Sequence, residues 1–287
     1  MSDQDRQGEK TKGRADQLLV SQGLAPSREK ARALIMAGQV YDGTSRVNKA
    51  GEMIGGQKQL TVKGRGLPYV SRGGLKLAAA LDAFPIDLKG LITLDIGAST
   101  GGFTDCMLQR GAARVHAVDV GYGQMDWKLR QDPRVVLREK TNARYLKPED
   151  LGEKADFAAV DVSFISLAKI LPVLPPILNA RGAGVALIKP QFEAGRESVG
   201  KKGVVRDPAV HRRVLLKALS DAEGAGLEAL GLIPSPIRGP EGNIEYLLWF
   251  TLPQPGDPQG IADGGGRLSR RCMEIVAETF SAPSAVR

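Results

Sequence analysis

The sequence contains few of the residues that bind metals or cross-link chains. Among 287 residues there are two cysteines and two histidines. Cys106 and Cys272 lie far apart in the sequence, so they have neither the spacing of a zinc site nor that of a disulfide framework. This scarcity excludes the disulfide-rich secreted domains and the zinc modules. It favours the cytoplasm, where thiols stay free, and predicts no metal.

Long apolar runs are also missing. A membrane-spanning helix needs about 20 consecutive apolar residues, and no run in the chain approaches that length. The N-terminal sequence MSDQDRQGEKTKGRADQ is polar and lacks the apolar core of a secretory signal. We therefore expect a cytoplasmic protein without a membrane partner. Its hydrophobic content of 42% is ordinary for a globular chain.

Positive charge is concentrated near the N-terminus. The formal net charge is +8, and residues 1–66 hold 12 Lys and Arg against 7 Asp and Glu. The remaining 221 residues are nearly balanced, with 28 basic and 25 acidic side chains. A small basic region beside a nearly neutral one is typical of an appended domain that binds a polyanion such as nucleic acid. A solvated basic surface has the same composition.

The N-terminal region has the pattern of a small α+β domain. Apolar spacing predicts helices over Arg14–Gln22 and Arg28–Ala37. Ser27 can cap the second helix, and Gly38 follows it at the usual position for a helix end. The segments GQVYDGTSRVNKAGEMI and KQLTVKG then predict short strands broken by turns. Residues 1–12, which precede this unit, are expected to be disordered.

The stretch RADQLLVSQGLAPSREKARALIMAGQV resembles the small RNA-binding domain first described in ribosomal protein S-four. The resemblance covers most of residues 13–65 and implies that basic side chains contact the RNA backbone. A packing domain with an ordinary charged surface is the alternative. The matching positions are Arg14, Arg28, Lys30 and Arg32, with Arg46 and Lys49 on the turn.

Beyond a Gly/Pro linker at residues 66–70, a larger α/β domain is expected over residues 71–252. SRGGLKLAAALDAF predicts a helix that carries Lys76, and apolar strands then alternate with helices, as in a buried parallel sheet. The last two strands have no helix between them and are expected to pair antiparallel. This is the layout of a Rossmann-like seven-stranded methyltransferase sheet. The candidate strands are LITLDIG, RVHAVDV, VVLRE, ADFAAVDVSF, GVALIK, LEALGLI and IEYLLWFTL.

The C-terminal segment, residues 253–287, begins with PQPGDPQGIADGGG, whose composition is typical of a flexible linker. A short helix at about Leu268–Phe280 is possible within this tail.

The first strand of the α/β domain runs into a loop of small residues that opens a helix, LDIGASTGGFTD. Small residues let a ligand approach the backbone, and the helix start offers free N–H groups. A dinucleotide loop has the spacing G-x-G-x-x-G, whereas this one has Gly97-x-x-x-Gly101 preceded by Asp95. That acid repels a pyrophosphate but suits an ammonium group, which favours S-adenosylmethionine. The candidate cofactor residues are Asp95, Gly97, Ala98, Ser99, Gly101, Gly102, Phe103, Asp119 and Asn142.

Two of these positions have expected partners on the cofactor. Asp119 ends the second strand, where a carboxylate can accept the ribose hydroxyls, although NAD needs the same acid. Asn142 follows the third strand and could face the adenine.

Charged residues also stand at the ends of later strands. Asp161 closes the fourth strand and Lys189 the fifth, and a lysine that ends a buried apolar strand is costly to keep. Glu245 opens the last strand. The Asn/Asp-Pro-Pro-aromatic motif of enzymes that methylate amino groups of bases is absent. With Lys76, these residues form the candidate catalytic set, although Lys76 alone could be a solvated helix residue.

The four positions resemble the Lys-Asp-Lys-Glu tetrad of FtsJ-type ribose methyltransferases. Together with SRGGLKL, DIGASTGGFTD, AVDVSFISL, IKPQFEAGRESVGKKGVVRD and GNIEYLLWF, the chain is similar to the TlyA family, also called hemolysin A. The resemblance runs over about residues 13–252. It implies S-adenosylmethionine-dependent methyl transfer to a cytidine 2′-hydroxyl of ribosomal RNA, in the small subunit, the large subunit or both.

The chemistry of that reaction gives each residue an expected role. A ribose hydroxyl must lose its proton as the methyl arrives, and a neutral lysine can accept it. A free lysine has a pKa of about 10.4, which desolvation and a nearby cation lower. We expect Lys189 to be the base and Lys76 the second cation. Asp161 would hold Lys189, and Glu245 would position Lys76 or the ribose.

Other residues are given supporting or structural roles. The polar loop Gln191–Asp207 is expected to close over RNA, or else to be a surface loop. His116 is expected in the core and His211 on a helix surface. The candidate RNA contacts in the loop are Arg196, Lys201, Lys202 and Arg206.

Three other functions remain to be weighed. A NAD-dependent oxidoreductase needs the dinucleotide glycine pattern and a Tyr or His proton donor, and neither is found. A membrane-lytic protein needs secretion and a long amphipathic or apolar segment. A non-catalytic RNA-binding factor would not need the tetrad. The sequence therefore favours a methyltransferase that acts on ribosomal RNA or ribosomal subunits.

Overall fold

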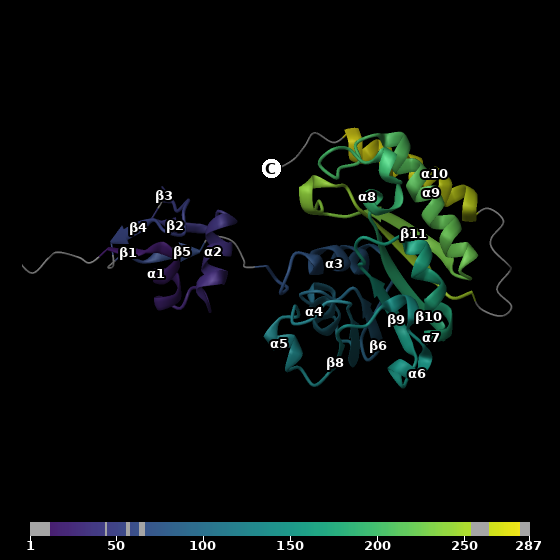
Figure 1. The fold of residues 1–287 in the computed structure, drawn as a ribbon, viewed down its shortest axis with the longest axis horizontal. Coiled ribbons are helices and arrows are strands. Elements are labelled where there is room, and N and C mark those ends of the chain that lie inside the picture. Colours follow the sequence, from purple (N-terminus) through teal and green to yellow (C-terminus); the bar gives the residue numbers. More distant parts are fainter. Residues whose placement is uncertain (1–11, 44, 56–57, 63–66, 254–263, 282–287) are drawn as a thin grey trace, which may run out of the picture. The chain divides into compact units, whose positions relative to one another are not determined.

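The computed structural model describes residues 12–43, 45–55, 58–62, 67–253 and 264–281. The chain divides into two units, Met1–Pro68 and Tyr69–Arg287 (Figure 1). The disorder expected for residues 1–12 falls almost entirely outside the described residues. Among the described residues, no helix is long and apolar enough to cross a membrane.

The N-terminal unit packs two helices and short strands around a small apolar core. As predicted, the side chain of Ser27 caps the second helix by accepting a hydrogen bond from the backbone N–H of Lys30. Gly38 has a φ of +69°, a left-handed conformation that suits glycine at a helix end. Leu19, Ile35 and Val40 are among the buried residues of the core. The elements are β1 (Lys12–Arg14), α1 (Ala15–Ser21), α2 (Arg28–Met36), β2 (Val40–Asp42), β3 (Ser45–Arg46), β4 (Met53–Gly55) and β5 (Leu60–Val62).

The C-terminal unit is built on a seven-stranded sheet in the order β11-β12-β10-β9-β6-β7-β8. Neighbouring strands from β10 to β8 are parallel, while β12 is antiparallel to both β10 and β11. The predicted seven-stranded sheet and its antiparallel last pair are confirmed. The strands are β6 (Ile92–Ile96), β7 (Arg114–Val118), β8 (Val135–Arg138), β9 (Ala155–Val160), β10 (Leu178–Ile188), β11 (Glu228–Pro234) and β12 (Tyr246–Thr251).

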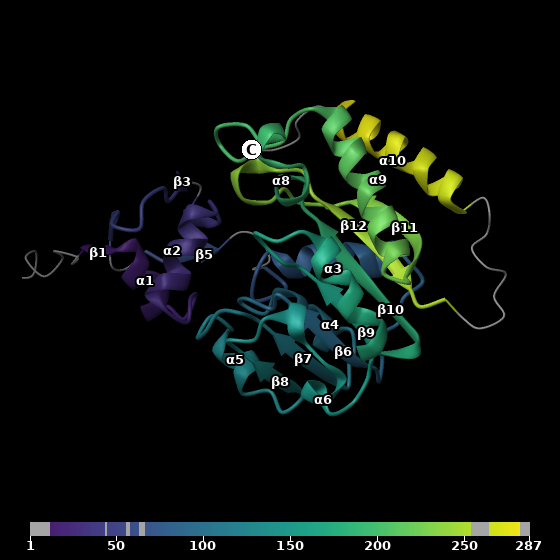
Figure 2. The same ribbon diagram turned by 45° about the vertical axis from the view of Figure 1, so that its right-hand side comes forward.

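Helices cover both faces of this sheet (Figures 1 and 2). One buried cluster joins α3 and α4 to the sheet, and a larger one joins α7, α9 and α10 to its other face. Because successive strand residues point to opposite faces, Leu247 lies in the first cluster and Leu248 in the second. The helices are α3 (Gly73–Ala83), α4 (Gly102–Gln109), α5 (Trp127–Arg130), α6 (Pro148–Leu151), α7 (Leu174–Ile177), α8 (Pro190–Glu193), α9 (Pro208–Gly224) and α10 (Gly264–Ser281).

Two expectations need correction. Helix α10 is longer than the short helix considered for a flexible tail, and it packs on the core beside α9 (Figure 2). Its apolar residues Leu268, Cys272 and Ile275 recur at helical spacing and are buried, which explains the packing. His211 is not on a helix surface but fully buried. His116 is buried, as predicted.

Candidate active site

The four charged candidates line one cavity of about 550 Å³. Asp161 follows β9 and Lys189 follows β10, so both lie at the carboxyl edge of the parallel strands. Ile188 pairs with Tyr246 in the antiparallel ladder, which places Glu245 beside Lys189 at the same edge. Lys76 reaches the cavity from α3. The topology of the sheet therefore brings together residues that are widely separated in the sequence.

Lys189 is held by two polar groups. Its Nζ lies 2.6 Å from Oδ1 of Asp161 and donates a hydrogen bond of 2.9 Å to Oγ of Ser163. Lys189 is 8% exposed, so its charge is largely removed from water and needs these partners. Sequence reasoning gave no role to Ser163, which lies two residues after Asp161.

Lys76 and Glu245 form a second buried pair. Nζ of Lys76 donates to Oε2 of Glu245 at 2.6 Å, while Lys76 is 8% and Glu245 1% exposed. Glu245 therefore pairs with Lys76. A Cβ at Gly239 would lie 2.3 Å from Oε1 of Glu245, so a larger residue there would displace this carboxylate. Each lysine in the cavity thus has its own carboxylate.

The small-residue loop between β6 and α4 forms one wall of the same cavity. Gly97 has a φ of +89°, and a Cβ there would lie 2.4 Å from the backbone oxygen of Asp161. Gly101 has a φ of +93°, and Ser99, with a φ of 47°, is also left-handed. These conformations bring the loop backbone directly against the segment that carries Asp161. Ala98, Gly102 and Phe103 complete the wall.

Asp119 lies in an adjoining cavity of about 470 Å³ that shares Gly97, Ser99 and Asp161 with the first. Its carboxylate accepts hydrogen bonds from the backbone N–H of Ser99 (2.7 Å) and of Gly121 (2.6 Å). A carboxylate has about four acceptor positions, so two remain for ligand hydroxyls. Asn142 lines this cavity too, and its side chain accepts from the N–H of Arg144.

Asp95 does not line either cavity. Its side chain is 0% exposed and accepts a hydrogen bond of 2.6 Å from Oγ1 of Thr104. Burial raises the pKa of Asp95 to about 7, although the Thr104 hydrogen bond opposes the shift. Its Oδ1 has no hydrogen-bond partner among the described residues. A direct contact from Asp95 to a ligand in these cavities is therefore not supported by the geometry.

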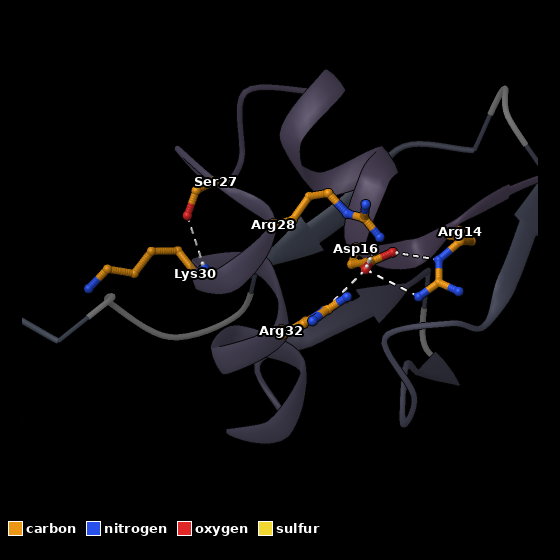
Figure 3. Close-up of polar contacts among 6 residues, drawn as sticks. All are labelled: Arg14, Asp16, Ser27, Arg28, Lys30 and Arg32. Atoms are coloured by element: carbon orange, nitrogen blue, oxygen red, sulfur yellow. Dashed lines mark hydrogen bonds and ion pairs between the residues drawn. The ribbon is translucent and has the colours of Figure 1, made fainter.

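The predicted RNA-binding residues fall in both units. In the N-terminal unit, Arg14, Arg28 and Arg32 converge on Asp16, while Lys30 points away from it (Figure 3). In the C-terminal unit, the loop candidates Arg196, Lys201, Lys202 and Arg206 are all exposed.

Hydrogen bonds of the Val205 backbone hold the loop Gln191–Asp207 in place. The backbone N–H of Val205 donates to Oδ1 of Asn243 at 3.2 Å, and its carbonyl lies 3.0 Å from Nε2 of His211. Because that carbonyl can only accept, Nε2 of His211 carries the proton and Nδ1 accepts from the hydroxyl of Tyr246 at 2.9 Å. His211 is thus a neutral anchor for the loop, and burial lowers its pKa.

Sequence reasoning also missed Phe164. This side chain is 90% exposed, lines both cavities and has a φ of 64°, which is rare for a bulky residue. Its ring centroid lies 5.0 Å from that of Phe192. An exposed aromatic ring at a cavity mouth is a surface on which an RNA base can stack.

Two family models match the chain. The FtsJ-like methyltransferase model matches residues 69–252, and the S4 domain model matches residues 13–60. The first match covers more than half of the chain and includes every residue of the two lysine–carboxylate pairs. The protein is therefore an FtsJ-like methyltransferase with an N-terminal S4 domain.

Similar proteins show to which family of FtsJ-like methyltransferases the chain belongs. The chain is 56% identical over 268 residues to "Putative rRNA methyltransferase YqxC" of Bacillus subtilis, covering 93% of this chain and 94% of the relative. It is 47% identical over 240 residues to "16S/23S rRNA (cytidine-2'-O)-methyltransferase TlyA" of Mycobacterium tuberculosis, covering 83% and 90%. The solved structure "Putative hemolysin from Streptococcus thermophilus" matches with a TM-score of 0.67 and 46% identity, covering 94% and 99%. The chain belongs to the TlyA family, which confirms the resemblance read from its motifs.

Proposed function

We propose that this protein transfers a methyl group from S-adenosylmethionine to a ribose 2′-hydroxyl of ribosomal RNA. The proposal rests on one cavity beside the glycine loop. It is lined by two ion pairs, Lys189 with Asp161 and Lys76 with Glu245. The printed names of the relatives, which include an rRNA (cytidine-2'-O)-methyltransferase, support the RNA substrate. By the same likeness we propose cytidine as the target, in one or both ribosomal subunits, and a cytoplasmic site of action.

The chain's residues fit S-adenosylmethionine. The loop Gly97–Gly102 lets a ligand approach the backbone, and Asp119 retains acceptor positions toward the adjoining cavity for ribose hydroxyls. Asn142 lines the same cavity, where an adenine can lie. We assign Asp95 no direct contact with the cofactor, because it is fully buried and lines neither cavity.

The methyl group of a sulfonium is already activated, so the protein's task is to orient the hydroxyl and receive its proton. We assign Lys189 as the base: once its ammonium group has released a proton to solvent, the neutral Nζ accepts the proton of the hydroxyl. Asp161 and Ser163 hold that nitrogen in place. Lys76 supplies a second cation, and Glu245 positions it. Among the described residues, no group of three or more histidine, cysteine, aspartate or glutamate side chains could hold a metal ion.

RNA binding is divided between two basic surfaces in this proposal. The S4 domain contributes Arg14, Arg28 and Arg32, and phosphate contacts of this kind position an RNA without reading its sequence. The loop that Val205 anchors contributes the second surface, through Arg196, Lys201 and Arg206.

The test is a comparison of ribosomal RNA from a wild-type strain and a strain that lacks the gene. Positions of 2′-O-methylation are mapped in both subunits, and the gene is restored as a control. We expect at least one 2′-O-methylcytidine to disappear in the deletion strain and to return on complementation. Identical maps in the two strains would contradict the proposal.

A further inference from the structure

The N-terminal unit contains a buried aspartate to which the proposed function assigns no role. Asp16, in the first turn of α1, is 0% exposed, which is unusual for an aspartate. The guanidinium groups of Arg14, Arg28 and Arg32 surround its carboxylate (Figure 3). We call these four residues the Asp16 cluster.

The contacts to Asp16 are directional. Arg14 donates from Nε to Oδ1 at 3.0 Å and from Nη2 to Oδ2 at 3.3 Å. Arg28 donates from Nη2 at 3.1 Å and Arg32 from Nε at 3.3 Å, both to Oδ2. Arg28 and Arg32 are four residues apart on α2, so they lie on the same face of that helix. The hydrogen bonds, that of Arg14 first, hold the pKa of Asp16 below its usual range and keep it ionised.

The three arginines still face solvent. Their side chains are 42%, 50% and 54% exposed for Arg14, Arg28 and Arg32. Each guanidinium has five N–H groups, and the contacts to Asp16 use two from Arg14 and one from each of the others. Most donors therefore remain available for another anion. With three cations and one anion, the cluster has a net positive charge.

We propose that Asp16 is a positioning residue for RNA binding, which fixes the three guanidinium groups in one arrangement suited to phosphates of the RNA backbone. An arginine loses rotamer freedom when it binds a phosphate, and a side chain that is already oriented loses less. The inference rests on the proposed function for its ligand, an RNA phosphodiester. It does not depend on methyl transfer.

An argument from net charge alone predicts the opposite change in RNA affinity when Asp16 is replaced, which makes the inference testable. Removing the negative charge of Asp16 increases the net positive charge of the surface. If charge alone governed binding, an Asp16→Asn variant would bind RNA more tightly. If Asp16 positions the arginines, the same variant binds RNA more weakly and makes fewer phosphate contacts, so the affinity depends less steeply on salt concentration.

The experiment measures the affinity of the full-length protein for transcribed small- and large-subunit ribosomal RNA over a series of salt concentrations. We expect Asp16→Asn to weaken binding about tenfold at low salt and to flatten the salt dependence. The matched control is Asp42→Asn, which removes a partly exposed carboxylate paired with Lys58 at 2.6 Å in the same unit. We expect it to change affinity less than twofold, as is usual for a surface pair. Equal or tighter binding by Asp16→Asn would overturn the inference.

Charge-preserving variants keep the test decisive if Asp16→Asn does not fold. Arg28→Lys with Arg32→Lys retains both charges on partly exposed side chains, but a lysine lacks the fixed fork of donors. We expect weaker RNA binding, whereas Lys58→Arg, which keeps the charge of a surface pair with Asp42 in the same unit, should leave affinity unchanged. An unchanged affinity in the double variant would contradict the positioning role.

Kinetics separate this inference from the proposed function. We expect Asp16→Asn to raise the KM for RNA while kcat and S-adenosylmethionine binding stay unchanged. If the wild-type protein binds RNA but transfers no methyl group, the proposed function fails and the binding result for Asp16 still stands.

Discussion

The two units of this protein use buried carboxylates in different ways. In the N-terminal unit, one buried aspartate meets three arginines that remain about half exposed, so a positive surface faces solvent. In the cavity of the C-terminal unit, each lysine has its own carboxylate, and both lysines are 8% exposed. The first arrangement leaves donors free for a polyanion. The second balances each buried positive charge with a negative one, and it holds in place the lysine nitrogen that we propose as the proton acceptor.

This contrast fits the tasks that we propose for the two units. Phosphate binding needs many outward-facing donors, and arginine supplies five on a planar group that remains protonated. Proton transfer needs a nitrogen that can give up its proton, which lysine can do and arginine cannot. The S4 domain accordingly uses arginine in its cluster, and the cavity uses lysine.

Lys189→Arg tests whether the cavity needs a base or only a positive charge. Arginine keeps the charge beside Asp161 but cannot act as a proton acceptor. Because general-base catalysis contributes roughly 10²–10⁴-fold, we expect kcat to fall about 1000-fold. S-adenosylmethionine affinity, measured by calorimetry, should remain within a few fold. Lys217→Arg, at a surface pair with Asp221 on α9, is the control. Full activity in Lys189→Arg would refute the assigned mechanism.

Deleting residues 1–65 tests whether RNA affinity resides in the N-terminal unit. The C-terminal unit has its own buried clusters and should remain folded. Loss of a second tethered binding surface should lower affinity for ribosomal RNA about 100-fold, while S-adenosylmethionine binding is kept. Filter binding and calorimetry measure the two quantities. Unchanged RNA affinity would show that the S4 domain has a different task.

Breaking the Lys76–Glu245 pair tests whether the two buried charges stabilise each other in the folded protein. Lys76→Met leaves Glu245 buried without its partner, and breaking such a pair costs about 3 kcal/mol in the free energy of unfolding. Urea denaturation measures this loss. Adding Glu245→Gln to Lys76→Met should recover part of it. If the single variant is as stable as the wild type, the pair contributes little to the fold.

Asp95 provides a smaller effect that depends on pH. The pKa of Asp95 in the folded protein is raised from the ordinary value of 3.8 to about 7. At a pH between these two values, the folded state holds a proton that the unfolded state has lost. This group's contribution to stability is present at low pH and is lost as pH rises toward 7. Between pH 5 and 6.5 the free energy of unfolding should fall by about 2 kcal/mol.

The Asp95→Asn variant isolates that contribution. Asparagine has no proton to lose, so the fall between pH 5 and 6.5 should be absent while the rest of the pH profile is kept. Parallel wild-type and variant profiles in urea denaturation would show that Asp95 is not protonated in the folded protein.

Much of the fold and the tetrad could be predicted because their signals are local. Strand periodicity, the Ser27 cap and the turn at Gly38 each depend on a few neighbouring residues. Lys189 and Glu245 could be placed at one edge because adjacent strand ends meet there. The helical spacing of His211 with Val214, Leu215 and Ala218, all buried, was also available and would have shown that His211 faces the core.

The remaining features depend on tertiary contacts. In the sequence, Asp16 is a single acid close to Arg14, and only the packing of α1 on α2 brings Arg28 and Arg32 to it. Asp95 accepts its hydrogen bond from Thr104, which lies on the helix after the loop. The exposed ring of Phe164 results from a left-handed backbone conformation that no sequence motif marked.

The central claim is that the cavity delivers a methyl group to a ribose hydroxyl. The direct measurement incubates the full-length protein with isotopically labelled S-adenosylmethionine and unmodified ribosomal RNA, then digests the RNA to nucleosides for mass spectrometry. Lys189→Arg is run in parallel. We predict that the label appears on the ribose as 2′-O-methylcytidine with the wild-type protein and is absent with the variant. Label on a nucleobase, or equal labelling by both proteins, would contradict the account.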